Sequence, residues 1–95
     1  MKESYIYILS NKNRTVFYTG ITADLSKRMR LHLEGVGSKF CDKYNVRELL
    51  YYELFINIDE AIKREKEIKG WRREKKIALI CNKNPDLRNL LEKKL

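Results

Sequence analysis

The pattern of apolar and polar residues begins with two short strands. Residues 4–10 read Ser-Tyr-Ile-Tyr-Ile-Leu-Ser, and residues 15–21 read Thr-Val-Phe-Tyr-Thr-Gly-Ile. Both segments are rich in β-branched and aromatic residues, which favour strands. The polar run at residues 11–14 separates them and has the composition of a turn. We therefore predict an antiparallel hairpin at the start of the chain.

The next part of the chain predicts a helix, a loop and a third strand. Apolar residues recur at four-residue spacing and form one helical stripe, at Leu25, Met29 and Leu33. Thr22 or Asp24 can cap the start of this helix, and Gly35 can end it. Residues 35–45 are predicted as a loop because they contain glycines and polar residues. Residues 46–55 are predicted as a strand.

The remainder of the chain predicts three helices. They span residues 57 or 59 to about 71, 72–81 and 86–94. Gly70 marks the break between the first two, and Asn84-Pro85 ends the second. The element order β-β-α-β-α-α-α predicts an α+β fold, with a small three-stranded antiparallel sheet flanked by helices. The 95 residues are enough for one domain, over residues 1–95.

The positive net charge of the chain indicates a polyanionic partner. The chain carries 21 Lys and Arg against 13 Asp and Glu, a net charge of +8. Nucleic acid is the first interpretation, and an anionic membrane surface is the second. A third is a protein-interaction domain whose charge only keeps it in solution. A basic run between residues 63 and 76, interleaved with glutamates, favours contact with a nucleic-acid backbone.

The two cysteines exclude a zinc finger and indicate a reducing compartment. Cys41 and Cys81 are far apart, and the chain has a single histidine, His32. Two thiols and one imidazole cannot supply the four ligands of a structural zinc site. The sequence also has no apolar run long enough for a signal peptide or a membrane span. These features predict a cytoplasmic protein.

Tyrosines in the predicted hairpin are the first candidates for chemistry. Tyr5 and Tyr7 alternate on one strand, and the pairing register could bring Tyr7 close to Tyr18 on the other. The alternative is that tyrosine is simply a good strand residue. Gly20 favours a function slightly, because a glycine within a strand often marks the close approach of a ligand or another backbone.

Arg28 and His32 are the second candidates. They lie four residues apart on the same side of the first predicted helix, beside its apolar stripe. An arginine at this place can stabilise charge on a phosphoryl group, and a histidine can move a proton. The alternative is a surface arginine with a packed histidine.

Glu65 is the third candidate. It occupies the inward stripe of its helix, between Ala61 and Ile68, where an apolar residue is expected. A carboxylate there is costly unless it is paired or bound to a metal. The structural alternative is an ion pair with Arg28 or a nearby lysine. The functional one is a ligand for a divalent ion, since Mg²⁺ commonly takes only one or two protein carboxylates.

Taken in order, these residues resemble the GIY-YIG nuclease family. The matching motifs are Tyr5-Ile6-Tyr7, Tyr18-Thr19-Gly20, Asp24 to Arg28 with His32, Ala61 to Glu65 with Ile68-Lys69, and Asn84-Pro85. Residues 35–40 and 71–73 are similar to small single-domain bacterial members that resemble the N-terminal nuclease domain of UvrC. The chain departs from the family in one respect, because Tyr5 replaces the glycine of the first signature.

The resemblance implies a metal-dependent endonuclease that hydrolyses phosphodiester bonds of DNA, with a single Mg²⁺ or Mn²⁺ ion. Structured or damaged DNA in repair or recombination is the implied substrate. By resemblance, Glu65 would hold the metal, and Tyr7 and Tyr18 would be the candidates to activate water. Arg28 would stabilise the phosphate, and His32 would assist proton transfer. These side chains are expected to converge on one shallow hollow.

Basic residues on the same chain are predicted to contact the nucleic-acid backbone. They are Lys39, Lys43, Lys69, Arg72 and Arg73. Such contacts give salt-dependent and largely sequence-independent affinity. The alternative to the nuclease is a nucleic-acid-binding module that retains the fold and does not cut.

Overall fold

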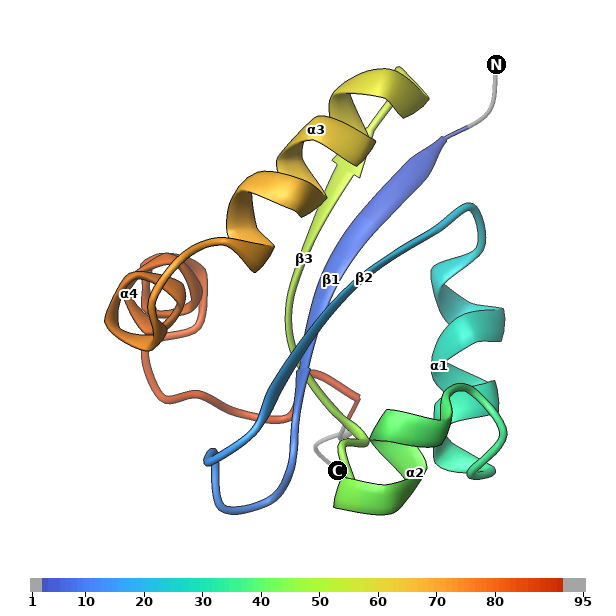
Figure 1. Ribbon diagram of the computed structural model, residues 1–95, viewed down its shortest axis with the longest axis vertical. Helices are drawn as coiled ribbons and strands as arrows, with labels where there is room; N and C mark the ends of the chain where they lie inside the picture. Colours follow the sequence, from blue (N-terminus) through green and yellow to red (C-terminus); the bar gives the residue numbers. More distant parts are fainter. Residues whose placement is uncertain (1–2, 92–95) are drawn as a thin grey trace.

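A three-stranded antiparallel sheet in the order β2-β1-β3 forms the centre of the molecule (Figure 1). The computed structural model describes residues 3–91. The strands are β1 (Ser4–Ser10), β2 (Phe17–Thr22) and β3 (Glu48–Phe55). The helices are α1 (Leu25–Leu33), α2 (Lys39–Tyr44), α3 (Ile58–Lys69) and α4 (Arg73–Lys83). The predicted fold class, a three-stranded antiparallel sheet flanked by helices, is confirmed.

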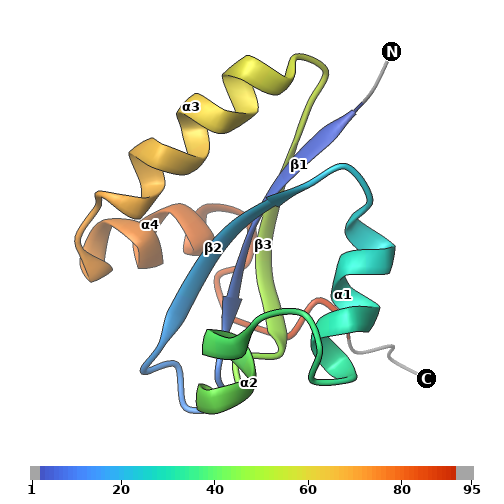
Figure 2. The same ribbon diagram turned by 45° about the vertical axis from the view of Figure 1, so that its right-hand side comes forward.

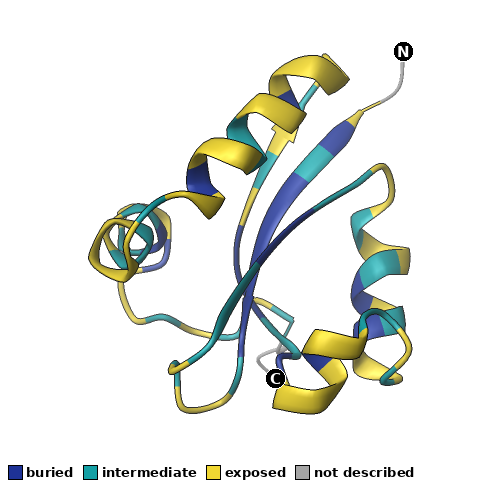
Figure 3. Cartoon of the chain, in the orientation of Figure 1, coloured by how far each residue is buried: buried dark blue, intermediate teal, exposed yellow. Residues whose placement is uncertain are grey.

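The helices cover both faces of the sheet. Helices α3 and α4 lie on one face, and α1 and α2 lie on the other (Figures 1 and 2). Side chains of a strand alternate between faces. Ile6 and Ile8 therefore point to α3 and α4, whereas Tyr7 and Leu9 point to α1 and α2. The central strand β1 is consequently buried along nearly its whole length, and the helices expose their outer sides (Figure 3).

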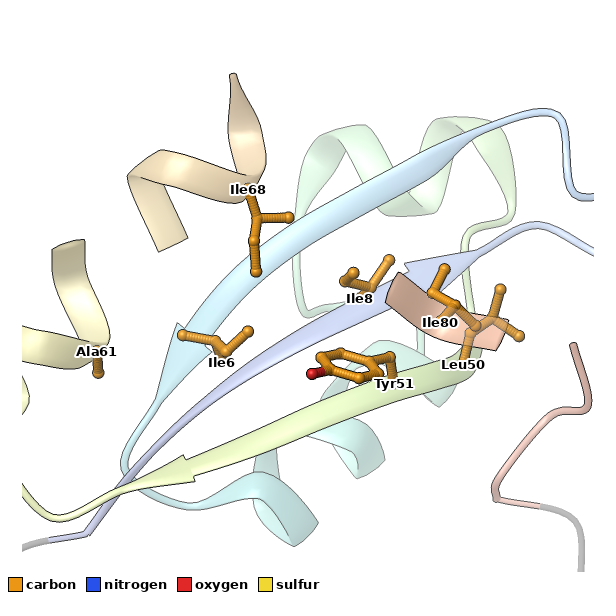
Figure 4. Packing of buried hydrophobic residues seen from close by; sticks show 7 residues of the cluster. All are labelled: Ile6, Ile8, Leu50, Tyr51, Ala61, Ile68 and Ile80. Carbon is orange, nitrogen blue, oxygen red and sulfur yellow. The ribbon is translucent and has the colours of Figure 1, made fainter. Parts of the chain in front are cut away.

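A bulge in β3 shapes the core beneath α3 and α4. Ile8 pairs with Tyr51 and Leu9 pairs with Leu49, so that Leu50 is an extra residue on β3. The neighbours Leu50 and Tyr51 can therefore both enter the same cluster. Its members are Ile6, Ile8, Leu50, Tyr51, Ala61, Ile68 and Ile80 (Figure 4).

One segment predicted as a loop contains a helix. Residues 39–44 form α2, which begins where the Ser38 hydroxyl accepts a hydrogen bond from the Cys41 amide. The helix ends at Asn45, whose φ of 56° lies in the left-handed region that asparagine tolerates. The prediction of an irregular loop through this segment was wrong. It rested on the glycines at positions 35 and 37 and did not take into account that Ser38 can cap a helix.

The terminal helix predicted over residues 86–94 does not form in its described part. Residues 86–91 are not helical, and residues 92–94 lie outside the described residues. The chain instead runs back along the outer edge of β3. The Leu90 amide donates to the Leu49 carbonyl at 2.7 Å, and the Leu49 amide donates to Asn89 Oδ1 at 3.2 Å. Pairing with the edge strand therefore replaces the helical hydrogen bonds that the leucine spacing predicted.

Asn84 holds this return segment in place, and its loss is expected to destabilise the fold. Its side-chain amide donates to the carbonyls of Leu50 (3.0 Å) and Arg88 (2.8 Å) and accepts from the Arg88 amide (3.1 Å). We expect Asn84→Ala to lower the free energy of unfolding by about 2–3 kcal/mol, because buried backbone groups lose their partners. Urea denaturation measures this. The exposed Asn82 provides a control, and equal effects of Asn84→Ala and Asn82→Ala would contradict the account.

Neither cysteine forms a disulfide. Cys41 is buried and Cys81 is half-buried, and both are free thiols. Burial raises the pKa of the Cys41 thiol. Cys41 thus packs as a small apolar residue of the core beneath α1 and α2. Across residues 3–91, no helix is long and apolar enough to cross a membrane.

Candidate active site

The hairpin register places two tyrosines together on the α1 side of the sheet. Tyr7 pairs with Gly20, and Leu9 pairs with Tyr18. Tyr7 and Tyr18 are therefore diagonal neighbours on one face, with ring centroids 6.4 Å apart. The structure thus brings Tyr7 and Tyr18 close together, as the strand register allowed in the sequence analysis.

The Tyr7 ring lies over Gly20 and leaves no room for a side chain at this position. A Cβ atom added to Gly20 would come within 2.4 Å of the Tyr7 hydroxyl oxygen and 2.5 Å of its Cζ. Since β2 is an edge strand, the phenol of Tyr7 extends across β2 towards the edge of the sheet. The glycine within the strand thus marks close approach, but by a neighbouring side chain rather than by a ligand or another backbone.

His32 packs against both phenols. Its side chain comes from α1 and is 3% exposed, with Nε2 3.5 Å from the Tyr7 hydroxyl oxygen. Its ring centroid lies 6.0 Å from those of Tyr7 and Tyr18. Two neighbours that sequence reasoning did not single out complete the packing. Gly37 leaves room for the imidazole, and Phe40 of α2 stacks on Tyr18.

Protonation of His32 is expected to destabilise the fold. Burial, assisted by the positive charge of Arg28, lowers the pKa of His32. A histidine whose pKa is depressed in the folded state contributes stability above its ordinary pKa of about 6.5, and that stability is lost as pH falls towards the depressed value. We expect the free energy of unfolding, measured by urea denaturation, to fall between pH 7.5 and pH 5. The drop attributable to this group should disappear in His32→Gln. An equal pH dependence in both proteins would contradict the expectation.

Arg28 and Glu65 both influence the pKa of Tyr7, although they come from helices on opposite faces of the sheet. Burial is the main reason that the pKa of Tyr7 is raised; Tyr18 and Glu65 raise it further, and Arg28 lowers it. Both charges therefore lie within electrostatic range of the Tyr7 hydroxyl. Glu65 comes from α3, which covers the other face of the sheet and packs against the edge strand β2 as well as β1.

Glu65 is held by a lysine from its own helix. Lys69 Nζ lies 3.0 Å from Glu65 Oε2, one turn further along α3. The Glu65 side chain is 14% exposed and sits between Ala61 and Ile68, which are fully buried. Of the alternatives open in the sequence, the structural one with a nearby lysine is therefore present. It leaves the carboxylate in place as a possible metal ligand.

The predicted backbone-contacting residues fall into two groups. Lys39, Lys43 and Arg72 are exposed. Lys69 is paired with Glu65, and the Arg73 guanidinium donates to the carbonyls of the hairpin loop at residues 14 and 15. Arg73 therefore has a structural contact that the sequence did not reveal, since its partners are backbone atoms distant in the chain.

An open hollow lies beside Arg28, between the first turns of α1 and α3. Its lining includes Ile21, Lys27, Leu31 and Ile58 as well as Arg28. The hollow leaves the Arg28 side of the site accessible from solvent.

The chemistry of the Glu65 carboxylate suits a hard divalent cation. In the region from residue 3 to residue 91, no three His, Cys, Asp or Glu side chains gather into a metal-binding cluster. Glu65 would thus be a single oxygen ligand. Mg²⁺ tolerates this arrangement because it commonly takes one or two carboxylates and fills its remaining positions with water and phosphate oxygens. A structural zinc ion, which needs four protein ligands, does not fit.

Comparison with known proteins agrees with the fold. The model of the GIY-YIG catalytic domain matches residues 3–78, and the chain belongs to this family of nuclease domains. A UPF0213 protein of Staphylococcus saprophyticus is 41% identical over 84% of this chain and 96% of its own length. A UPF0213 protein of Clostridium perfringens is 40% identical, over 85% of this chain and 86% of its own. The family resemblance seen in the sequence is confirmed.

A solved structure shows the same arrangement of elements. The UPF0213 protein BH0048 from Bacillus halodurans, determined by solution NMR, has 31% sequence identity and a TM-score of 0.60. The match covers 94% of each chain.

The departure at the first signature causes no conflict in the fold. Tyr5 is half-buried on the sheet surface and packs edge-on against Tyr52, with ring centroids 6.4 Å apart. Its side chain thus lies towards β3, whereas Tyr7 extends towards β2 and the candidate site.

Proposed function

We propose that this chain is a metal-dependent endonuclease that hydrolyses phosphodiester bonds of DNA, with structured or damaged DNA as the substrate. One observation carries the proposal. Tyr7, Tyr18 and His32 gather on one face of the sheet, and the charges of Arg28 in α1 and Glu65 in α3 lie close enough to influence the pKa of Tyr7. In a family of nuclease domains, this combination supplies the groups that phosphodiester hydrolysis requires.

The two tyrosines have different environments, which supports different roles. Tyr7 is 2% exposed, and its raised pKa keeps the phenol protonated and uncharged, 3.5 Å from His32 Nε2. Tyr18 is half-buried and therefore more accessible to water. We assign Tyr18 as the group that orients and activates the attacking water. The neutral imidazole of His32, in contact with both rings, is the acceptor for the proton.

Arg28 and Glu65 act on the phosphate. The Arg28 guanidinium would donate hydrogen bonds to phosphate oxygens and stabilise the charge that develops on them. Glu65 would hold the divalent ion. When bound, such an ion polarises the phosphate and stabilises the leaving oxygen.

The charge of the protein suits a nucleic-acid backbone. The net charge is +8, and Lys39, Lys43 and Arg72 are exposed. Contacts of this kind are sequence-independent, and the affinity falls with rising salt concentration.

A cleavage screen tests the proposal. Purified protein is incubated with flap, nicked, single-stranded and supercoiled DNA and with RNA, each with and without Mn²⁺. We expect Mn²⁺-dependent cleavage of at least one structured DNA. It should be lost in Arg28→Ala and kept in Arg30→Ala, since Arg30 is an exposed arginine of the same helix. Salt-sensitive binding without cleavage of any substrate would instead identify a nucleic-acid-binding module that retains the fold.

A further inference from the structure

The ion pair between Glu65 and Lys69 joins a fixed anion to a mobile cation. The Glu65 side chain is 14% exposed and anchored between buried residues of α3. The Lys69 side chain is 53% exposed, and its ammonium sits on a flexible four-carbon stem. The ammonium can therefore leave the carboxylate for water, whereas the carboxylate cannot follow it.

The other ion pairs of α3 are separate from this one. Arg64 pairs with Glu53 and Glu67, and it also lies over the ring of Trp71. Lys69 is thus the ion-pair partner that the described residues give to Glu65. A lysine ammonium interacts with a carboxylate as a single point charge, whereas an arginine guanidinium would form a bidentate pair of hydrogen bonds. The contact suits exchange of one cation for another.

We infer that Lys69 is a built-in counter-ion of Glu65, which a divalent cation displaces and which then contacts a phosphate of the nucleic acid. The inference rests on the proposed function, because it takes Glu65 as the metal ligand. An ammonium at 3.0 Å from Oε2 and a divalent cation on the same carboxylate repel each other. Binding of the ion therefore frees Lys69, and the binding of metal and of nucleic acid becomes mutually favourable.

The metal side of the inference is tested by Mn²⁺ titration of the protein alone, with free Mn²⁺ followed by EPR. We expect Lys69→Gln to bind Mn²⁺ about two- to five-fold more tightly than the wild type, the range that corresponds to losing an exposed ion pair. Lys66→Gln removes the same charge from an exposed position of α3 and should change the affinity by less than about 1.5-fold. Equal affinities in Lys69→Gln and Lys66→Gln would overturn the inference.

One further variant separates this inference from the proposed function. Glu65→Gln should abolish Mn²⁺ binding. If it does not, the assignment of Glu65 as metal ligand fails and the inference fails with it. If it does, but Lys69→Gln binds Mn²⁺ like the wild type, only the counter-ion role is overturned.

The nucleic-acid side is tested with a short DNA duplex in EDTA. Glu65→Gln releases Lys69, so the affinity should rise about three-fold and the salt dependence should steepen by about one phosphate contact. Glu67→Gln removes the same charge but leaves its partner Arg64 held by Glu53, and should change both quantities less. The double variant Glu65→Gln, Lys69→Gln should lose this gain in affinity for DNA. Equal behaviour of Glu65→Gln and Glu67→Gln would show that Lys69 does not contact phosphate.

Discussion

Replacing Glu65 by glutamine is expected to reduce metal-dependent cleavage by a factor on the order of 10³ or more. A bound divalent ion is worth several kcal/mol to the transition state, and about 1.4 kcal/mol corresponds to a tenfold change in rate. Glutamine keeps the shape of the side chain but loses the charge that would hold the ion. The measurement is the cleavage rate at saturating Mn²⁺ on the best substrate from the screen.

The fold should survive this change. The side chain loses one ion pair to a half-exposed lysine, which is worth about 1 kcal/mol or less. Glu67→Gln is the matched control, since it removes a carboxylate two residues away that pairs with Arg64. Cleavage by Glu65→Gln at the rate of Glu67→Gln would remove Glu65 from the active site.

Replacing Gly20 by alanine is expected to disrupt both the fold and the site. The new methyl group would lie 2.4 Å from the Tyr7 hydroxyl oxygen and 2.5 Å from Cζ, so the buried ring would have to move. Overpacking of this kind typically costs about 1–3 kcal/mol. We expect a loss of stability at the upper end of that range and cleavage reduced at least tenfold, because Tyr7 would leave His32 and Tyr18. Urea denaturation and the cleavage assay measure the two effects.

Gly70 offers the control for this substitution. It ends α3 with a φ of −81°, and the nearest atom to an added Cβ is a backbone oxygen at 3.5 Å. Gly70→Ala should therefore be neutral or slightly stabilising, because alanine has less conformational freedom to lose on folding. If Gly20→Ala were as harmless as Gly70→Ala, the Tyr7 ring could not lie where the structure places it.

Most of the fold could be read from local patterns. The strands and the helices α1, α3 and α4 have clear periodicity and end near caps or breakers such as Asp24 and Gly70. The two errors, at residues 39–44 and 86–91, have a common cause. In both segments the outcome depends on a few polar side chains, Ser38 for α2 and Asn84 for the return along β3, rather than on a repeating apolar pattern.

The sequence indicated candidates for the site, but it could not indicate how they are arranged. Polar residues at apolar positions, Glu65 above all, identified candidates because burial of a carboxylate needs a reason. Sequence spacing could not show that α3 and α1 lie on opposite faces, nor that Gly20 lets Tyr7 extend over the edge strand. The pairing of Lys69 with Glu65 was only one of the open alternatives, beside an ion pair with Arg28 and a role as ligand of a divalent ion.

Paramagnetic broadening by Mn²⁺ tests the central claim, that Glu65 of α3 shares one metal site with the phenols of Tyr7 and Tyr18. With the protein in NMR solution, sub-stoichiometric Mn²⁺ should broaden signals of Glu65, Tyr18 and the Tyr7 ring together, and should spare the far end of α4. Broadening confined to α3, or unchanged in Glu65→Gln, would show that the carboxylate and the phenols do not share one ion.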